Sequence, residues 1–258
     1  MIITVTANPS IDRSLLLVNP LARGEVQTVL PGVDEAGGKG ANVAKALVAA
    51  GIETAALVLA DADDPYLALL RATGTPIVTA AATSPVRINL TITEPDGTTT
   101  KLNAPGASSA DALEGLRRTL LATIDAANDS GAAAPPPFVV LSGSLPSGAD
   151  AAWYARLLPA LAERGVRVAV DTSGAPLAAV IEAAGAGSRI AVIKPNGDEL
   201  SEALRSTGID ANVPDGDELE SDPTLAVAAV HTLMAARPGI EAVLLTLGAR
   251  GAILVTGA

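Results

Sequence analysis

Short apolar runs alternate with amphipathic stretches along most of the chain. Runs of this kind are typical of buried strands, and they occur at residues 2–6, 54–60, 77–80, 138–141, 166–170, 190–193 and 243–247. Segments in which apolar residues have helical spacing separate several of these runs. The clearest is at residues 110–127, where leucines recur at i, i+3 and i+4. Strands that alternate with helices predict a parallel sheet with helices on both faces.

Four further strands interrupt this alternation, at residues 14–18, 26–33, 86–93 and 98–103. No helix separates the members of either pair. Val86, Ile88 and Leu90 alternate with polar residues, and the Asp96-Gly97 turn that follows predicts a hairpin. We therefore expect a small antiparallel sheet, which would either cover a site as a lid or pair with another subunit.

The predicted domains follow from these two patterns. The main α/β domain comprises residues 1–9, 35–83 and 105–258, and the β-sheet lid comprises residues 10–34 and 84–104. A low-complexity stretch at residues 131–137 predicts a surface loop. The acidic stretch at residues 209–223 predicts a solvated insertion rather than a metal site, because its carboxylates lack regular ligand spacing.

Composition excludes several classes of function. A net charge of −11 and four aromatic residues in 258 argue against a nucleic-acid partner. The absence of cysteine excludes disulfides, thiolate catalysis and cysteine zinc sites, and the single histidine, His231, lies in an apolar helical pattern unsuited to a Ser-His-Asp triad. Because no apolar run approaches the length of a membrane span and the N-terminus is unlike a signal peptide, we expect a soluble cytoplasmic protein with no membrane partner.

The stretch GGKGANVAKAL at residues 37–47 predicts a glycine-rich turn that opens a helix. The unpaired N–H groups of a first helical turn, together with Lys39, would suit an anionic or polyhydroxyl ligand. Gly40 replaces the Ser or Thr of a Walker loop, and Val43 replaces the third glycine of the dinucleotide motif. A turn that serves only packing is the alternative.

Polar residues follow the predicted strands, and the carboxyl ends of such strands meet at one edge of the sheet. These residues are Asn8 and Asp12, Ser142 and Ser144, Asp171, Lys194 and Asn196, and the segment 246–251. Asp12 could accept hydrogen bonds from sugar hydroxyls or cap a turn. Arg87, on the polar face of the hairpin with Asn89, could bind phosphate through its planar guanidinium or be an exposed charge. The concentration at one edge predicts an active site there.

With these segments in this order, the chain resembles the PfkB (ribokinase-like) family of sugar kinases, and within it the phosphosugar kinases. The resemblance covers almost the whole length. It rests on TANPSID (residues 6–12), GGKGANVAKAL (37–47), VRINLTI (86–92), SGSLPSG (142–148), DTSG (171–174), KPNGDEL (194–200) and TLGARG (246–251). It implies a ribokinase-like parallel sheet with helices on both faces and a small antiparallel β lid.

The resemblance also implies a role for each candidate residue. The sugar would be held by Asp12, Gly37, Gly38, Lys39, Asn42 and, from the lid, Asn89. Its phosphate would be held by Arg87 with Lys39 and Ser142 or Ser144. The ATP phosphates and, through water, Mg²⁺ would be organised by Lys194, Asn196 and Glu199, with Asp171 near the same metal. The nucleotide-binding turn would comprise Thr246, Gly248 and Gly251.

The implied activity is that of an ATP-dependent transferase that phosphorylates a sugar monophosphate. Fructose 1-phosphate, giving fructose 1,6-bisphosphate, is the first candidate; tagatose 6-phosphate and fructose 6-phosphate are alternatives, and a nucleoside is less favoured. The family's GAGD motif, which holds the catalytic aspartate, does not occur in the sequence. We therefore expect the catalytic residue beyond Ala258, or else a sugar-phosphate-binding remnant without activity. A homodimer through the lid is also expected.

Overall fold

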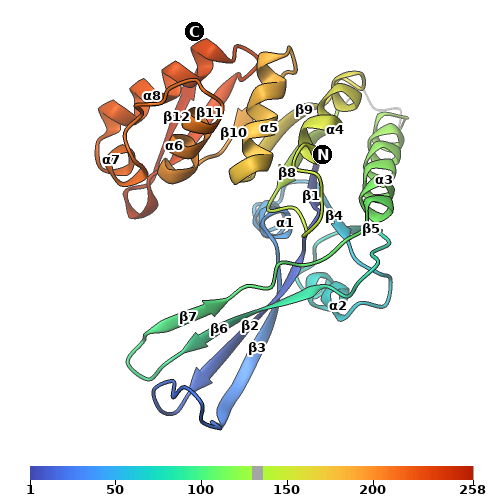
Figure 1. Ribbon diagram of the computed structural model, residues 1–258. Coiled ribbons are helices and arrows are strands. Elements are labelled where there is room, and N and C mark those ends of the chain that lie inside the picture. Colours follow the sequence, from blue (N-terminus) through green and yellow to red (C-terminus); the bar gives the residue numbers. More distant parts are fainter. Residues whose placement is uncertain (130–135, 258) are drawn as a thin grey trace.

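A mostly parallel sheet of eight strands forms the centre of the computed structural model, which describes residues 1–129 and 136–257 (Figure 1). Its strand order is β12-β11-β10-β9-β8-β1-β4-β5, and only β12 runs antiparallel to its neighbour. The strands are β1 (Ile2–Thr6), β4 (Thr54–Leu59), β5 (Ile77–Ala80), β8 (Phe138–Ser142), β9 (Arg167–Asp171), β10 (Val192–Ile193), β11 (Ala242–Thr246) and β12 (Ala252–Thr256). The predicted α/β class is confirmed.

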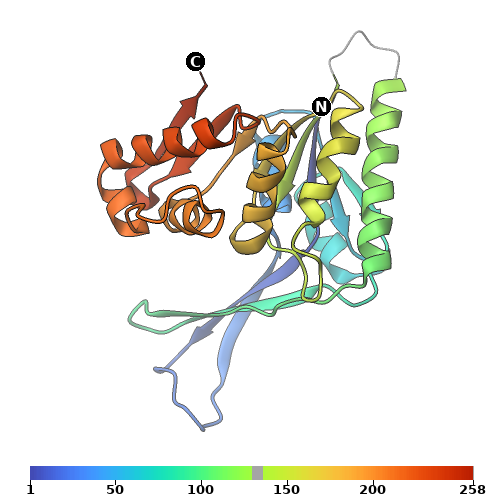
Figure 2. The ribbon, with the colours of Figure 1, turned by 45° about the horizontal axis from the view of Figure 1, so that its top comes forward.

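Helices cover both faces of this sheet, as Figure 2 shows. They are α1 (Lys39–Ala49), α2 (Pro65–Arg71), α3 (Ala110–Asp129), α4 (Trp153–Ala162), α5 (Gly174–Gly185), α6 (Gly197–Ser206), α7 (Gly216–Ser221) and α8 (Pro223–Ala236). Because alternate strand residues point to opposite faces, Ile3 and Val5 join the core under α3 and α4, whereas Ala56 and Val58 join a second core under α1 and α2. The two cores fix the sheet between two layers.

A second sheet, here called the small sheet, projects from the side where the parallel strands end (Figure 1). It contains β2 (Ser10–Leu17), β3 (Val29–Gly37), β6 (Arg87–Thr93) and β7 (Thr99–Leu102), in the order β3-β2-β6-β7. Its two predicted antiparallel pairs, β2–β3 and β6–β7, are present. They are joined by a parallel pairing of β2 with β6, which the sequence did not reveal.

Two boundaries of the small sheet differ from the prediction. β2 begins at Ser10 rather than at residue 14, and β3 continues to Gly37 rather than ending at residue 33. The sequence does not predict the first residues of β2, because Ser10 and Asp12 place polar side chains at positions where a strand pattern would have apolar ones. β3 therefore leads directly into the glycine-rich turn and α1.

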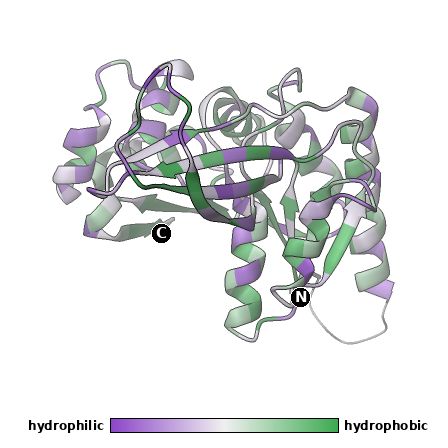
Figure 3. Ribbon diagram, turned by 90° about the horizontal axis from the view of Figure 1, so that it is seen from below, coloured by the Kyte–Doolittle hydropathy of each residue, from purple (hydrophilic) through white to green (hydrophobic). Residues whose placement is uncertain are grey.

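Several large apolar side chains of the small sheet are exposed. Purple and green positions are mixed along it in Figure 3. The exposed large hydrophobic side chains of its strands and connecting turns are Leu16, Val18, Leu21, Val26, Val29, Leu30, Val33, Ile88 and Leu102. The register places Leu16, Leu30 and Val33 on one face of the sheet and Ile88 and Leu102 on the other. Exposed apolar side chains that gather on a surface are typical of a contact with another molecule.

The acidic stretch at residues 209–223 is more ordered than the prediction of a solvated insertion. Val213 and Leu219 are buried in the main core, and Asp215 caps α7 by accepting a hydrogen bond from the Glu218 N–H at 2.9 Å. Most of the loop predicted at residues 131–137 lies outside the described residues. None of the helices in the described ranges combines the length and the apolar character that crossing a bilayer requires.

Candidate active site

The glycines of the turn before α1 let this helix sit directly on the end of β1. A Cβ at Gly40 would lie 2.5 Å from Thr6 Oγ1 and 2.6 Å from the Val5 carbonyl oxygen. Gly38 has a φ of 101°, which disfavours other residues, and a Cβ at Gly37 would overlap the Asp12 carboxylate. Packing thus requires these glycines, and the same packing brings the first turn of α1 to the carboxyl edge of the sheet.

Lys39 lies in a cluster of four charged side chains at that edge. Its Nζ donates a hydrogen bond to Asp171 Oδ1 at 3.1 Å and lies 3.9 Å from Glu199 Oε1. The Nζ of Lys194 lies 3.2 Å from the same Asp171 oxygen. The four residues come from α1, the end of β9, the residue after β10, and the first turn of α6. The structure therefore brings Lys39 beside the residues predicted for ATP and magnesium.

Asn196 and Glu199 also form the N-terminal cap of α6. Asn196 Oδ1 accepts a hydrogen bond from the Glu199 N–H at 2.8 Å, and Glu199 Oε2 accepts one from the Asn196 N–H at 3.0 Å. This capping box fixes both side chains at the start of the helix. It also leaves the second oxygen of Glu199 directed toward Lys39.

Asp12 and Asn89 meet across the parallel pairing of β2 and β6, where they are register partners. Asn89 Nδ2 donates a hydrogen bond to Asp12 Oδ1 at 3.0 Å, and the Ser10 hydroxyl donates a second at 2.8 Å. Asn89 Oδ1 is buried and has no partner within the described part of the chain. The pair therefore offers hydroxyl groups a carboxylate that is fixed through Oδ1 and whose Oδ2 has no hydrogen bond among the described residues.

Arg87 lies two residues before Asn89 on β6 and is held by backbone carbonyls. Its guanidinium donates to the Ala104 carbonyl oxygen and, at 3.5 Å, to that of Asn8. Burial lowers the pKa of Arg87, and the negative charge of Asp12 opposes this shift. Its Nε is buried without a partner among the described residues. The two contacts use one N–H of each terminal nitrogen, so the guanidinium keeps terminal donors for an anion.

Asn8 connects Arg87 to the loop after β8. The Asn8 Nδ2 group donates to the Pro105 carbonyl oxygen at 3.0 Å and to Ser144 Oγ at 3.2 Å. Sequence reasoning placed Asn8 among the polar residues at the sheet edge but gave it no role. Its position between a buried strand and Pro9 was the available signal.

The two candidate serines separate in the structure. Ser142 is fully buried, is the register partner of Asp171 on β9, and has no hydrogen-bond partner for its hydroxyl among the described residues. Ser144 is exposed, and its hydroxyl accepts a hydrogen bond from the Asn8 side chain, whose backbone carbonyl contacts Arg87. Asn42 is exposed in the first turn of α1, where its N–H bonds to the Gly38 carbonyl oxygen at 2.9 Å.

The segment predicted as a nucleotide-binding turn lies beside the start of α6. The Thr246 N–H donates to the Pro195 carbonyl oxygen at 3.0 Å. Gly248 and Gly251 then adopt positive φ values of 56° and 94°, which turn the chain back into β12. A groove of ≈ 500 Å³ between this turn and α7 is lined by residues that include Glu220 and Arg250.

These segments have the arrangement found in a known family. The family model of the pfkB family carbohydrate kinases matches residues 5–258. The chain belongs to this family. The fold prediction, the family resemblance and the enzyme class, a phosphotransferase with an alcohol acceptor, are thereby confirmed. Membership of a kinase family implies ATP as donor and typically a divalent metal.

Curated PfkB relatives and solved structures cover almost the whole chain. A 1-phosphofructokinase of Xanthomonas campestris pv. campestris is 36% identical over 257 residues, which are 98% of this chain and 73% of that protein. A 1-phosphofructokinase of Rhodobacter capsulatus is 33% identical, over 100% of this chain and 74% of its own length. The crystal structure of phosphofructokinase-2 from Escherichia coli in complex with fructose-6-phosphate matches with a TM-score of 0.80 and 26% identity, over 99% of this chain and 77% of that one.

Proposed function

We propose that this PfkB kinase transfers a phosphoryl group from ATP to a sugar monophosphate, with fructose 1-phosphate as the first candidate. Relatives that cover nearly the whole chain carry the name 1-phosphofructokinase. The observation that carries the proposal is the placement of Arg87 and Asn89 on one face of β6, with Asn89 bonded to Asp12.

This placement suits a molecule with a hydroxyl-bearing body and a phosphate at one end. Alternate residues of a strand point to the same side and lie about 6.6 Å apart. Asp12 and Asn89 would bind hydroxyl groups of the sugar, and Arg87 would bind the phosphate through the terminal N–H groups that its contacts with Ala104 and Asn8 leave free. The first turn of α1, with Gly38 as its cap and no side-chain capping bond, would attract the same anion.

The charged cluster supports the other half of the reaction. Lys39, which the resemblance assigned to the sugar and its phosphate, would instead bind phosphate oxygens of ATP together with Lys194, because its Nζ lies beside Asp171 and Glu199. Thr246, Gly248 and Gly251 would form the turn that contacts the nucleotide. No group of three candidate metal ligands occurs within the described residues, but Asp171 and Glu199 offer the hard oxygen donors that Mg²⁺ binds through water when phosphates supply other ligands. When bound, Mg²⁺ would neutralise charge on the phosphates.

Fructose 6-phosphate is the second candidate substrate, and tagatose 6-phosphate a third. An ATP-dependent 6-phosphofructokinase isozyme 2 from Escherichia coli is 31% identical over 204 residues, 78% of this chain and 61% of that protein. All three compounds present a phosphate and several hydroxyls to the same groups. Charged substrates of this kind belong to the cytoplasm, where we expect the protein to act.

The small sheet would serve as the lid and as a homodimer contact. Its strands carry Asp12, Arg87 and Asn89, so it can cover the sugar, and its apolar side chains remain exposed in the single chain. A structure described as the tetrameric inhibited form of phosphofructokinase-2 from Escherichia coli matches with 27% identity and a TM-score of 0.81, over 99% of this chain and 76% of that one. Light scattering tests the dimer: a mass of one chain at micromolar concentration would contradict it.

Calorimetric titration tests the substrate class without requiring turnover. We expect fructose 1-phosphate to bind to the 258-residue chain at least tenfold more tightly than unphosphorylated fructose, because a charge-assisted hydrogen bond contributes about 1.5–3 kcal/mol. Arg87→Ala should abolish this preference. Arg13→Ala is the matched control, since Arg13 is bound to Asp34 on the same sheet at 2.6 Å. Equal binding of both sugars would refute the proposal.

A further inference from the structure

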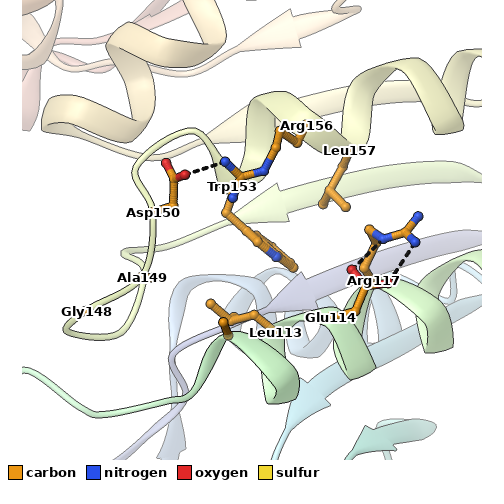
Figure 4. A pocket seen from close by; sticks show the side chains of 10 residues that line it. Leu113, Glu114, Arg117, Gly148, Ala149, Asp150, Trp153, Arg156 and Leu157 are labelled. Carbon is orange, nitrogen blue, oxygen red and sulfur yellow. Dashed lines mark hydrogen bonds and ion pairs between the residues drawn. The ribbon is translucent and has the colours of Figure 1, made fainter.

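A cavity of ≈ 330 Å³ lies between α3 and α4, outside the site described above. Leu113, Trp153 and Leu157 form its apolar wall, and the loop at residues 148–150 closes one end (Figure 4). The volume is within the range of small-molecule sites. Such sites combine apolar walls with a few polar groups that orient the ligand, so the polar rim of this cavity decides what it can bind.

Two arginines line the rim, and each is bound to a carboxylate beside it. Arg117 donates from Nε and one terminal nitrogen to Glu114, at 2.8 and 2.7 Å. Arg156 donates to Asp150, whose other carboxylate oxygen accepts from the Ala152 N–H at 2.8 Å. Both acidic groups are thus already engaged.

The arginines have donors to spare. A guanidinium has five N–H groups, and these contacts use only part of that number on Arg117 and Arg156. The rim is therefore neutral overall but offers an excess of hydrogen-bond donors. An anionic group is what it can still bind.

We propose that this cavity is a second binding site, for a small organic anion with an aromatic or branched apolar body. The apolar body would lie against the accessible edge of the Trp153 indole, since Leu113 and Leu157 are almost completely buried, and the anionic group would accept hydrogen bonds from Arg117 and Arg156. The size of the cavity, its apolar wall and its donor-rich rim together favour this class over a neutral apolar compound or a bare inorganic ion.

The cavity also adjoins a residue that stabilises the backbone of the candidate active site. The Trp153 ring packs edge-on against Tyr154 with ring centroids 5.3 Å apart. The buried Tyr154 hydroxyl lies 3.3 Å from the Ser142 carbonyl oxygen and 3.2 Å from that of Gly143. A ligand that binds to Trp153 would therefore be separated only by the Tyr154 ring from Ser142 and Gly143, at the end of β8. This gives the second site a direct contact path to the first.

Fluorescence provides the test because Trp153 is the only tryptophan of the chain. The probe is 1-anilinonaphthalene-8-sulfonate, and its neutral analogue N-phenyl-1-naphthylamine has the same apolar body without the sulfonate. We expect one sulfonate probe to bind per chain, with energy transfer from Trp153, and to bind about tenfold more tightly than the neutral analogue. The 258-residue chain is used without sugar or ATP, so the result does not depend on the proposed function.

Variants locate the binding. Arg117→Gln and Arg156→Gln should each weaken the sulfonate probe about tenfold and leave the neutral analogue within twofold. Arg118→Gln is the matched control, because this exposed neighbour on α3 does not line the cavity. Ala110→Phe should fill the cavity entrance and remove binding of both probes. Circular dichroism and thermal unfolding of each variant would verify that it folds.

Four outcomes would overturn the proposal. Equal affinity for both probes would mean an apolar cavity without anion recognition. An Arg118→Gln loss as large as that of Arg117→Gln would mean a general charge effect on the surface. Failure of the sulfonate probe to bind, or binding that Ala110→Phe does not change, would mean that the cavity is not the site.

Discussion

Different interactions hold the side chains in the two halves of the candidate site, the half on β2 and β6 and the half at the ends of β9 and β10. In the half on β2 and β6, Asp12 accepts hydrogen bonds from Asn89 and Ser10, so the recognition groups are fixed before any ligand arrives. In the half at the ends of β9 and β10, Lys39 and Lys194 both contact one oxygen of Asp171. The first half is preorganised by hydrogen bonds, whereas the second is a set of charges that neutralise one another.

This difference has a consequence for ligand binding. A sugar can bind to the hydrogen-bonded half without displacing a contact of Asp12, because Asn89 and Ser10 both donate to Oδ1 and leave Oδ2 without a hydrogen bond among the described residues. A polyphosphate can bind to the charged half only by sharing or replacing the carboxylates on the two lysines. Substitutions in the first half should therefore affect one ligand, and those in the second should change the dependence of ATP binding on its metal.

The largest effect is expected for Asp12→Ala. This change removes the acceptor of two hydrogen bonds and the charged group that would face the sugar, so fructose 1-phosphate should bind about 100-fold more weakly. ATP should bind within twofold of the unchanged chain. Calorimetry of both ligands provides the measurement, and Asp34→Ala, which removes a carboxylate from β3 of the same sheet, is the control. If ATP lost as much affinity as the sugar phosphate, the two halves would not be separable.

The second effect concerns the charged half. Asp171→Asn removes the negative charge that Lys39 and Lys194 share, so both lysines become available to phosphate oxygens. Metal-free ATP should bind as tightly as before or more tightly, whereas the gain in affinity on adding Mg²⁺ should fall about tenfold. Titrations with and without Mg²⁺ give the ratio.

Asp198→Asn is the control for this experiment, since Asp198 is an exposed carboxylate in the first turn of α6, next to Glu199 of the charged cluster. It should leave the ratio unchanged. A parallel decrease of ATP affinity with and without the metal in Asp171→Asn would show that the carboxylate supports the lysines rather than the metal.

A smaller effect is expected from the capping box of α6. Asn196→Ala leaves the Glu199 N–H without its side-chain acceptor, and loss of such a cap costs about 1 kcal/mol of unfolding free energy. Urea unfolding should detect this, and Asn196→Asp, which keeps the acceptor, should restore most of it. Full stability in Asn196→Ala would mean that the cap does not contribute to the fold.

How far the sequence predicts this molecule depends on which interactions place each residue. The parallel strands are short apolar runs buried on both faces, so their local pattern is enough to predict them. β2 was placed four residues late because Ser10 and Asp12 are polar where they face the site. The parallel pairing of β2 with β6 is a long-range contact and leaves no local pattern.

In the site, too, local sequence patterns predict some features, whereas others depend on long-range packing. The motif Asn-x-x-Glu at residues 196–199 indicates a capping box in the sequence itself, although the family resemblance assigns these residues only to ATP and, through water, to Mg²⁺. The position of Lys39 Nζ could not be predicted, because its contacts with Asp171 and Glu199 depend on how α1, β9 and α6 are packed together. Roles in binding ATP, magnesium and the sugar remain predictions for the experiments above.

The smallest effects should come from two buried tyrosines that each support one half. The Tyr66 hydroxyl donates to the Gly37 carbonyl oxygen at 3.0 Å, beside Asp12, whereas that of Tyr154 lies between the Ser142 and Gly143 carbonyl oxygens, beside Asp171. Burial raises the pKa of both phenols, and since an ordinary tyrosine is already protonated at neutral pH, both hydroxyls are donors there.

Replacing either tyrosine by phenylalanine leaves buried carbonyl oxygens without this donor and should cost about 1 kcal/mol of stability. If the halves are supported separately, Tyr66→Phe should weaken fructose 1-phosphate a few-fold and spare ATP, and Tyr154→Phe should do the reverse. Calorimetry with both ligands on both variants makes each the control of the other. Identical changes in the two variants would show that the hydroxyls stabilise the whole sheet edge rather than one half of the site.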